Sequence, residues 1–120
     1  MHLETLTIAQ DAPFTLIAGP CVIESRNSAL SHAERIAAIA EKADVPYVFK
    51  ASYDKANRTS LHSYRGPGIK QGLEILAEIR DRTGVPVITD VHERQDVAAV
   101  ADVVDILQIL AFLCRQRPTW

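Results

Sequence analysis

The stretch "DVPYVFKA" occupies residues 44–51, and 40 residues later "GVPVITDV" repeats its layout over residues 84–91. Each copy begins with a turn-forming residue, continues with Val-Pro and then runs into an apolar segment. Proline is tolerated at the first residue of a strand because no ladder hydrogen bond is lost there. The repeat therefore predicts two buried strands that enter a sheet in the same way.

On both sides of this repeat, the chain alternates between apolar runs and segments with helical periodicity. Strands are expected where nearly continuous apolar residues indicate burial on both faces, over residues 14–19, 47–51, 85–90 and 105–110. Helices are expected between them, over residues 27–43, 69–84 and 93–103. Asn27 or Ser28 is the expected N-cap of the first helix, and Gly84 is the expected stop of the second.

Alternating strands and helices predict an α/β fold with a parallel sheet and right-handed crossovers. Two architectures fit the pattern, an open doubly wound sheet and a (βα)8 barrel. Both place ligands at the carboxyl ends of the strands. The polar residues at the strand ends are therefore expected to share one rim: Cys21, Lys50, Ser52, Asp90 and Gln108.

The segment after the second strand is basic, although the whole chain has a net charge of −2. From residue 50 to residue 65 there is one anion, Asp54, against four cations: Lys50, Lys55, Arg58 and Arg65. Ammonium and guanidinium groups beside hydroxyls suit phosphate and carboxylate oxygens, so an anion site is one interpretation. A solvated surface loop explains the charge count as well. Lys50 favours the anion site, because a charge within an apolar strand needs a partner.

The composition narrows the class of protein. The 120 residues correspond to one domain, and a pI near 6.0 argues against bulk nucleic-acid binding. No apolar run approaches the ~20 residues of a membrane span, and the N-terminus lacks the layout of a signal peptide. Two cysteines are too few for a disulfide framework, which fits a reducing compartment. These features predict a cytoplasmic globular protein that binds neither nucleic acid nor membrane.

Three further motifs are weak by themselves. "GPCVIES", residues 19–25, exposes Cys21 at a strand end, but a lone cysteine is more often a small buried residue than a ligand. In "TDVHE", residues 89–93, Asp90 and His92 could be ligands, acid–base groups or merely a helix cap with a solvated first turn. "YRGPG", residues 64–68, matches neither G-x-G-x-x-G nor the P-loop, so no nucleotide site is implied.

Four stretches, taken in this order, resemble the 3-deoxy-D-manno-octulosonate 8-phosphate synthase family: "IAGPCVIES", "PYVFKASYDKANRTSLHSYRGPG", "GVPVITDVHE" and the region of "AFLCRQ". The resemblance implies the N-terminal half of a TIM (βα)8 barrel, with a hairpin strand at residues 1–13, four βα units over residues 14–116 and a divergent end at residues 117–120. Members condense phosphoenolpyruvate with D-arabinose 5-phosphate and water, release phosphate and supply a sugar of lipopolysaccharide. They are commonly tetramers, so a homo-oligomer is expected.

The resemblance also implies roles for individual residues. Those expected to bind phosphoenolpyruvate are Lys50, Ser52 and Lys55. Those expected to bind arabinose 5-phosphate are Asn57, Arg58, Thr59 and Gln108, with Arg115 assisting near a subunit interface. The catalytic set would be Lys50, Lys55 and Asn57.

A divalent metal such as Mn, Zn or Fe is implied as well, because Cys21 stands where the metal-dependent members of the family carry cysteine. The remaining ligands of that metal belong to the half of the barrel that this sequence lacks. A complete barrel needs about 200–250 residues. In addition, Leu110 replaces a proline of the family, and "RPTW" replaces its continuation. We therefore expect a truncated chain that is inactive alone.

Two other functions stay open at this point. One is a related phosphoenolpyruvate-condensing synthase, of the heptulosonate-phosphate or sialic-acid type, although "DKANRTS" favours an arabinose 5-phosphate site. The other is a non-catalytic phosphate-binding module in a half-barrel fold.

Overall fold

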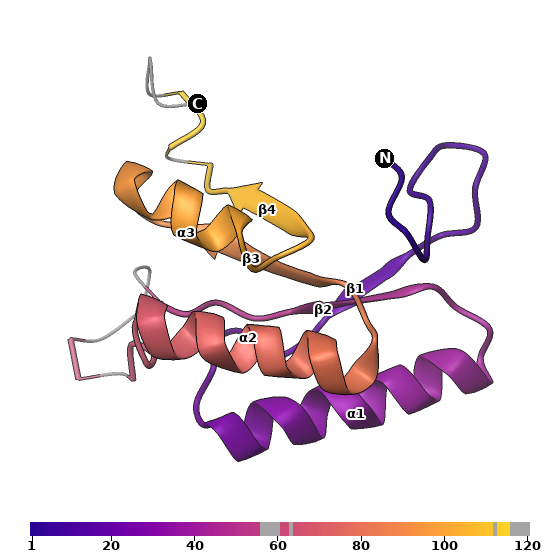
Figure 1. Ribbon diagram of the computed structural model, residues 1–120, viewed down its shortest axis with the longest axis horizontal. Coiled ribbons are helices and arrows are strands. Elements are labelled where there is room, and N and C mark those ends of the chain that lie inside the picture. The colour runs from indigo at the N-terminus through magenta and orange to yellow at the C-terminus, as the bar shows by residue number, and fades with distance from the viewer. Residues whose placement is uncertain (56–60, 63, 112, 116–120) are drawn as a thin grey trace.

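The computed structural model of the chain describes residues 1–55, 61–62, 64–111 and 113–115. Its strands are β1 (Leu16–Ala18), β2 (Tyr47–Lys50), β3 (Val87–Val91) and β4 (Ile106–Ile109). Its helices are α1 (Arg26–Lys42), α2 (Ile69–Thr83) and α3 (Val97–Ala101), the last preceded by a 3-10 turn, η1 (Arg94–Asp96). Strands and helices alternate along the whole chain (Figure 1).

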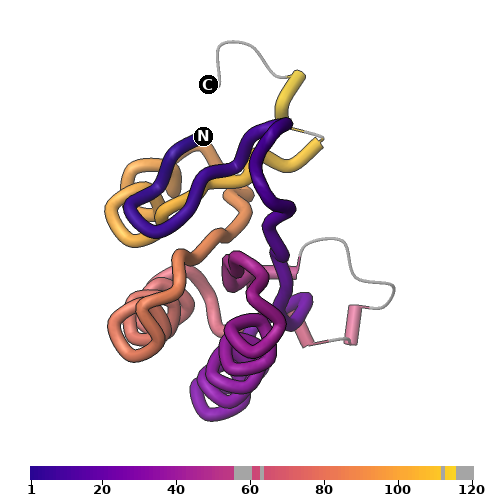
Figure 2. The backbone as a smooth tube through the Cα atoms, turned by 90° about the vertical axis from the view of Figure 1, so that its right-hand side faces the viewer, coloured from indigo at the N-terminus to yellow at the C-terminus, as the bar shows by residue number. Residues whose placement is uncertain are grey.

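The four strands form one parallel sheet in the order β1-β2-β3-β4. A doubly wound sheet reverses its strand order at a switch point, whereas a (βα)8 barrel keeps its strands in chain order. Among the described strands the order does not reverse, and the three helices follow one another along one side of the sheet (Figure 2). The structure thus has the architecture of half a (βα)8 barrel, and the expected fold class is confirmed.

Side chains along β2 and its extension alternate between two environments, as a period of two requires. Tyr47, Phe49, Ala51 and Tyr53 belong to the buried core between the sheet and the helices. Leu73, Leu76 and Ile79 of α2 pack into the same core, and so do Leu30, Ala33 and Ala40 of α1. The intervening residues of β2 point to the opposite side of the sheet, which is the interior of a barrel. This alternation separates the residues that stabilise the fold from those available for binding.

The ends of the helices differ in part from the expectation. The N-cap of α1 is Ser25, whose hydroxyl accepts a hydrogen bond from the backbone N–H of Ser28 at 3.1 Å, so the expected cap at Asn27 or Ser28 is wrong. Gly84 ends α2 as predicted, in the left-handed conformation with φ of 69°. The expected third helix is divided into η1 and the five-residue α3.

The N-terminal residues form a tight antiparallel turn ahead of the sheet. His2 and Thr7 make an isolated antiparallel bridge, and the N–H of Leu3 donates to the carbonyl of Leu6 at 2.8 Å. The first strand is shorter than expected, since Phe14 is 72% exposed and β1 begins only at Leu16. In the described part of the chain, no helix has both the length and the apolar character needed to cross a bilayer.

Candidate functional site

A cavity of about 390 Å³ lies at the carboxyl ends of the strands, and we call it the strand-end cavity. Its polar lining consists of Cys21, Lys50, Ser52, Asp54, Lys55, Asp90, His92 and Gln108. Leu110 and Ala111 complete it. All five polar residues that the sequence predicts for one rim are therefore brought together here. They come from the ends of the four strands or from the residues that follow them, and Lys50 and Ser52 share β2 and its extension.

The backbone geometry explains this convergence. Lys50, Ser52 and Asp54 share one face of β2 and its extension, and Asp90 of β3 is in register with Gln108 of β4. Cys21 joins them because the chain passes very close to β2 at the preceding glycine. A Cβ at Gly19 would overlap the carbonyl oxygen of Lys50, so only glycine fits there.

The charges of the basic segment are divided into two groups by the fold. Arg65 makes a two-pronged ion pair with Asp54, with Nε–Oδ1 and Nη2–Oδ2 distances of 2.7 and 3.0 Å. The hydrogen bond and the charge of Asp54 raise the pKa of Arg65 above its ordinary value. Lys50 and Lys55, in contrast, form no ion pair with any other residue that the structure describes. Two ammonium groups are thus left available to a ligand in the strand-end cavity.

A set of polar side chains, Ser52, Asp90 and His92, connects β2 with β3 beside the cavity. The hydroxyl of Ser52 donates a hydrogen bond to Oδ1 of Asp90, and Oδ2 of Asp90 lies 2.9 Å from Nε2 of His92. This short contact does not have the geometry of a hydrogen bond. Neither ring nitrogen of His92 has a hydrogen-bond partner among the described residues. The His92 side chain is only 9% exposed. The imidazole is thus a buried polar group beside the wall of the strand-end cavity, with both ring nitrogens unsatisfied among the described residues.

Tyr53 contacts His92 from the core side of the sheet. Its hydroxyl donates to Oδ2 of Asp96 at 3.3 Å and accepts the backbone N–H of His92 at 3.4 Å, while its ring packs edge-on against the imidazole with 5.3 Å between centroids. Burial raises the pKa of the Tyr53 phenol far above its ordinary value, so the group stays protonated and can donate. Helix α2 approaches closely at Gly72, where a Cβ would overlap the Tyr53 side chain.

Several predicted site residues are not among the described residues that line the cavity. Asn57, Arg58 and Thr59 lie outside the described residues. Arg115 is described and exposed, but it does not line the strand-end cavity. Sequence reasoning gave no role to Asp54, and it gave His92 only a weak one. The signal for both was their position at even spacing after Lys50 and Asp90, on the cavity side of each strand.

The described residues do not fit a complete divalent metal site. Cys21 is an exposed free thiol on the cavity wall, but no group of three or more histidine, cysteine, aspartate or glutamate side chains is arranged to hold an ion in the described part. Zinc usually takes at least three protein ligands. Cys21 therefore supplies one donor at most.

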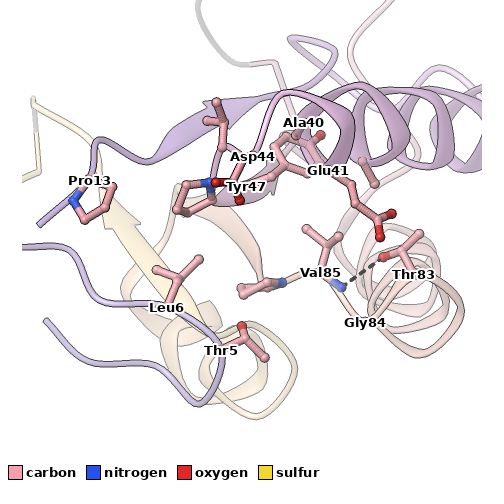
Figure 3. A pocket seen from close by; sticks show the side chains of 14 residues that line it. Thr5, Leu6, Pro13, Ala40, Glu41, Asp44, Tyr47, Thr83, Gly84 and Val85 are labelled. Atoms are coloured by element: carbon pink, nitrogen blue, oxygen red, sulfur yellow. Dashed lines mark hydrogen bonds between the residues drawn. The ribbon is translucent and has the colours of Figure 1, made fainter.

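A larger pocket, about 470 Å³, lies at the opposite end of the sheet (Figure 3). It is formed where the N-terminal turn, with Thr5 and Leu6, meets the segments that lead into β2 and β3. In Figure 3 the backbone N–H of Val85 donates to the hydroxyl of Thr83, at 3.2 Å. The charged residues of this pocket are Glu41 and Asp44, which would repel a phosphate. The smaller strand-end cavity is the better candidate for an anion.

The comparisons with known proteins identify a family for this chain. The sequence model of the DAHP synthetase I family matches residues 2–119. A protein from Vibrio atlanticus is 53% identical over 116 residues, which are 97% of this chain and 41% of that protein. A protein from Koribacter versatilis is 59% identical over 84% of this chain and 36% of that protein. A protein from Acidithiobacillus ferrooxidans is 58% identical over 87% of this chain and 37% of that protein. All three are named 2-dehydro-3-deoxyphosphooctonate aldolase. The chain spans about two fifths of the length of these curated relatives.

Proposed function

Because the chain belongs to the DAHP synthetase I family, we propose that its strand-end cavity forms part of an active site that condenses phosphoenolpyruvate with D-arabinose 5-phosphate. The products would be 3-deoxy-D-manno-octulosonate 8-phosphate and inorganic phosphate, for lipopolysaccharide synthesis. The name that the curated relatives carry supports this choice of reaction. A second candidate is condensation with erythrose 4-phosphate, which the description of the matching family favours.

One observation carries the proposal: Lys50 and Lys55 line the same cavity and have no ion-pair partner among the described residues. Phosphoenolpyruvate has a phosphate and a carboxylate, and the sugar brings a second phosphate. Two such anions repel each other strongly in a partly desolvated site. The two ammonium groups would offset this repulsion and hold the reactants in a geometry suited to attack.

The proposed reaction forms a bond between C3 of phosphoenolpyruvate and the aldehyde carbon of the sugar. The aldehyde oxygen takes up a proton and becomes a hydroxyl. Water adds at C2 and gives up one proton. The C2–O bond to phosphate then breaks while the new C2 hydroxyl gives up its proton to the departing phosphate, which leaves a ketone. His92 and Asp90, which line the cavity side by side, are the described groups able to move these protons. Ser52 and Gln108 add neutral hydrogen-bonding groups for substrate oxygens.

Calorimetric titration of the 120-residue chain with phosphoenolpyruvate tests the proposal. Lys50→Met and Lys55→Met each remove a charge but keep an apolar stem, and each is expected to weaken binding by about tenfold, since hydrogen bonds to charged groups contribute most. Lys42→Met is the matched control, because Lys42 is an exposed lysine in the last turn of α1, away from the cavity. Equal affinity of Lys50→Met and Lys42→Met would contradict the proposed site.

The same calorimetric experiment distinguishes the two candidate acceptor sugars. With phosphoenolpyruvate present, arabinose 5-phosphate is expected to bind more tightly than erythrose 4-phosphate, and the reverse order would favour the second candidate.

Turnover by the 120-residue chain alone is not expected. Four strands are described where a barrel has eight, and Cys21 is the one metal donor that the resemblance assigns within this sequence. Incubation with both substrates and Mn²⁺ or Zn²⁺, followed by assay of released phosphate, checks this. Release of phosphate that depends on both substrates would show that the 120 residues of this chain suffice for the reaction.

A further inference from the structure

Arg65 belongs to the basic segment, yet its charge is paired with the one carboxylate of that same segment. Both of its paired nitrogens contact the carboxylate of Asp54. The Arg65 side chain is 59% exposed and that of Asp54 is 21% exposed, so the pair lies near the surface rather than in the core. Asp54 itself lines this cavity, next to Lys55.

A carboxylate in that position is unfavourable for anion binding. At separations of several ångströms, like charges near a protein surface repel each other by an amount comparable to the attraction of one lysine. Asp54 would therefore cancel much of the benefit of Lys55 if its charge were not compensated. A planar guanidinium that contacts both carboxylate oxygens compensates it more completely than a single ammonium contact could.

The backbone at the base of this loop is held independently of the ion pair. The N–H of Lys55 donates to the carbonyl of Arg65 at 2.5 Å, and the N–H of Gly68 donates to the carbonyl of Tyr53 at 3.2 Å. Gly66 has a φ of 125°, and a Cβ there would overlap the Tyr53 carbonyl. None of these contacts uses the Arg65 side chain, so the loop base should persist when that side chain is shortened.

We propose that Arg65 is an internal counter-ion: it does not bind the substrate, but it neutralises Asp54 on the cavity wall so that Lys50 and Lys55 can attract a phosphorylated ligand. The inference rests on the proposed function, since it concerns the same anion site. Arg65 is in this sense a positioning residue that acts through Asp54. The role differs from the one that charge counting alone gives it, because only Lys50 and Lys55 of the described cations then face the ligand.

The experiment is a double-mutant cycle on the 120-residue chain, with phosphoenolpyruvate and inorganic phosphate as titrants in a calorimeter. Arg65→Met is expected to weaken phosphoenolpyruvate binding by about fivefold, the usual upper size of an exposed charge interaction. Asp54→Asn with Arg65→Met is expected to restore affinity to within about twofold of the original chain, because it removes the charge that Arg65 compensates. Arg82→Met is the matched control, an exposed arginine paired with Glu34 between α1 and α2.

Amide hydrogen exchange at Lys55 is measured on every variant, because it reports on the loop base. The proposal predicts exchange rates within about twofold of each other, since side-chain changes leave the backbone hydrogen bond to Arg65 in place. Faster exchange in Arg65→Met would show a structural role instead and overturn the inference. A double variant that binds as weakly as Arg65→Met would mean that Arg65 contacts the ligand directly, and would overturn it too. If the original chain binds neither titrant, the proposed function fails, and the inference fails with it.

Discussion

The hydroxyl of Ser52 donates a hydrogen bond to the carboxylate of Asp90 across the boundary between neighbouring strands. Asp90 is only 5% exposed, and burial of a polar group without a hydrogen-bond partner is unfavourable. Ser52 therefore has two tasks on the same face of the sheet: it satisfies Asp90, and it contributes to the wall of the strand-end cavity.

Ser52→Ala is expected to lower the free energy of unfolding by about 1–3 kcal/mol, because it leaves a buried acceptor with one donor fewer. Urea unfolding followed by circular dichroism measures the change. Ser31→Ala, on the exposed surface of α1, is the control and should have little effect. Equal stability of the two variants would mean that Asp90 does not depend on Ser52.

Gly72→Ala is expected to destabilise the protein, although alanine is the better helix former. The propensity gain is about 1 kcal/mol. A Cβ at this position would overlap the Cβ of Tyr53, which cannot rotate away, and overpacking of this kind costs about 1–3 kcal/mol. The net loss should be about 1 kcal/mol, measured by urea unfolding. Gln71→Ala, on the exposed face of the same helix, should be neutral or stabilising. A more stable Gly72→Ala variant would disprove the close contact.

The contact between α1 and α2 predicts a dependence of stability on pH. A hydrogen bond from Arg26, with a smaller contribution from charge, lowers the pKa of Glu78 below its ordinary value of 4.5. Because the folded-state pKa is the lower one, the stabilisation is complete well above pH 4.5 and is lost as the pH falls through the folded-state pKa.

The difference in urea midpoint between the original chain and Glu78→Gln should therefore be largest near neutral pH and vanish in acid. Added salt should also reduce it, since the pair is exposed. Glu74→Gln, on the exposed surface of α2, is the control. A midpoint difference that persists in acid would exclude this ion pair as its cause.

Zinc or manganese should bind the 120-residue chain only weakly. Sites that hold structural zinc with about 10–16 kcal/mol have a full set of ligands, and the described residues offer no group of three donors. Competition with a chromophoric chelator measures the affinity. Cys21→Ser should remove whatever zinc binding occurs in the strand-end cavity. Tight binding that survives this substitution would reveal a donor set elsewhere.

The order and type of the elements could be predicted from the sequence because they follow from periodicity and turn chemistry. The Val-Pro repeat, the buried strands and the stop at Gly84 depend on residues close together in the chain. The choice between a doubly wound sheet and a barrel could not be made in this way. It depends on which strands become neighbours, and both architectures alternate strands with helices.

The candidate site was predictable where it depends on strand ends, but not where it depends on contacts between distant residues. Convergence of Lys50, Ser52 and Gln108 follows from strand ends meeting at one edge of a parallel sheet. The pairing of Arg65 with Asp54 did not follow, because a separation of 11 positions in sequence gives no indication of which charges meet. The cap at Ser25 was missed because "SRNS", residues 25–28, offers three suitable capping residues within one turn.

The alternation along residues 47–54 has a consequence for how this segment tolerates change. Odd positions contact the helices, and the last three even positions face the strand-end cavity. A saturation scan across the segment should therefore oscillate with a period of two residues. Substitutions at odd positions would reduce the amount of intact protein recovered from cells. Substitutions at positions 50 and 54 would affect that amount less while changing ligand affinity, and those at position 52 would do both, because Ser52 also bonds to Asp90. Libraries aimed at altered ligand binding can accordingly vary positions 50 and 54 while the odd positions stay fixed.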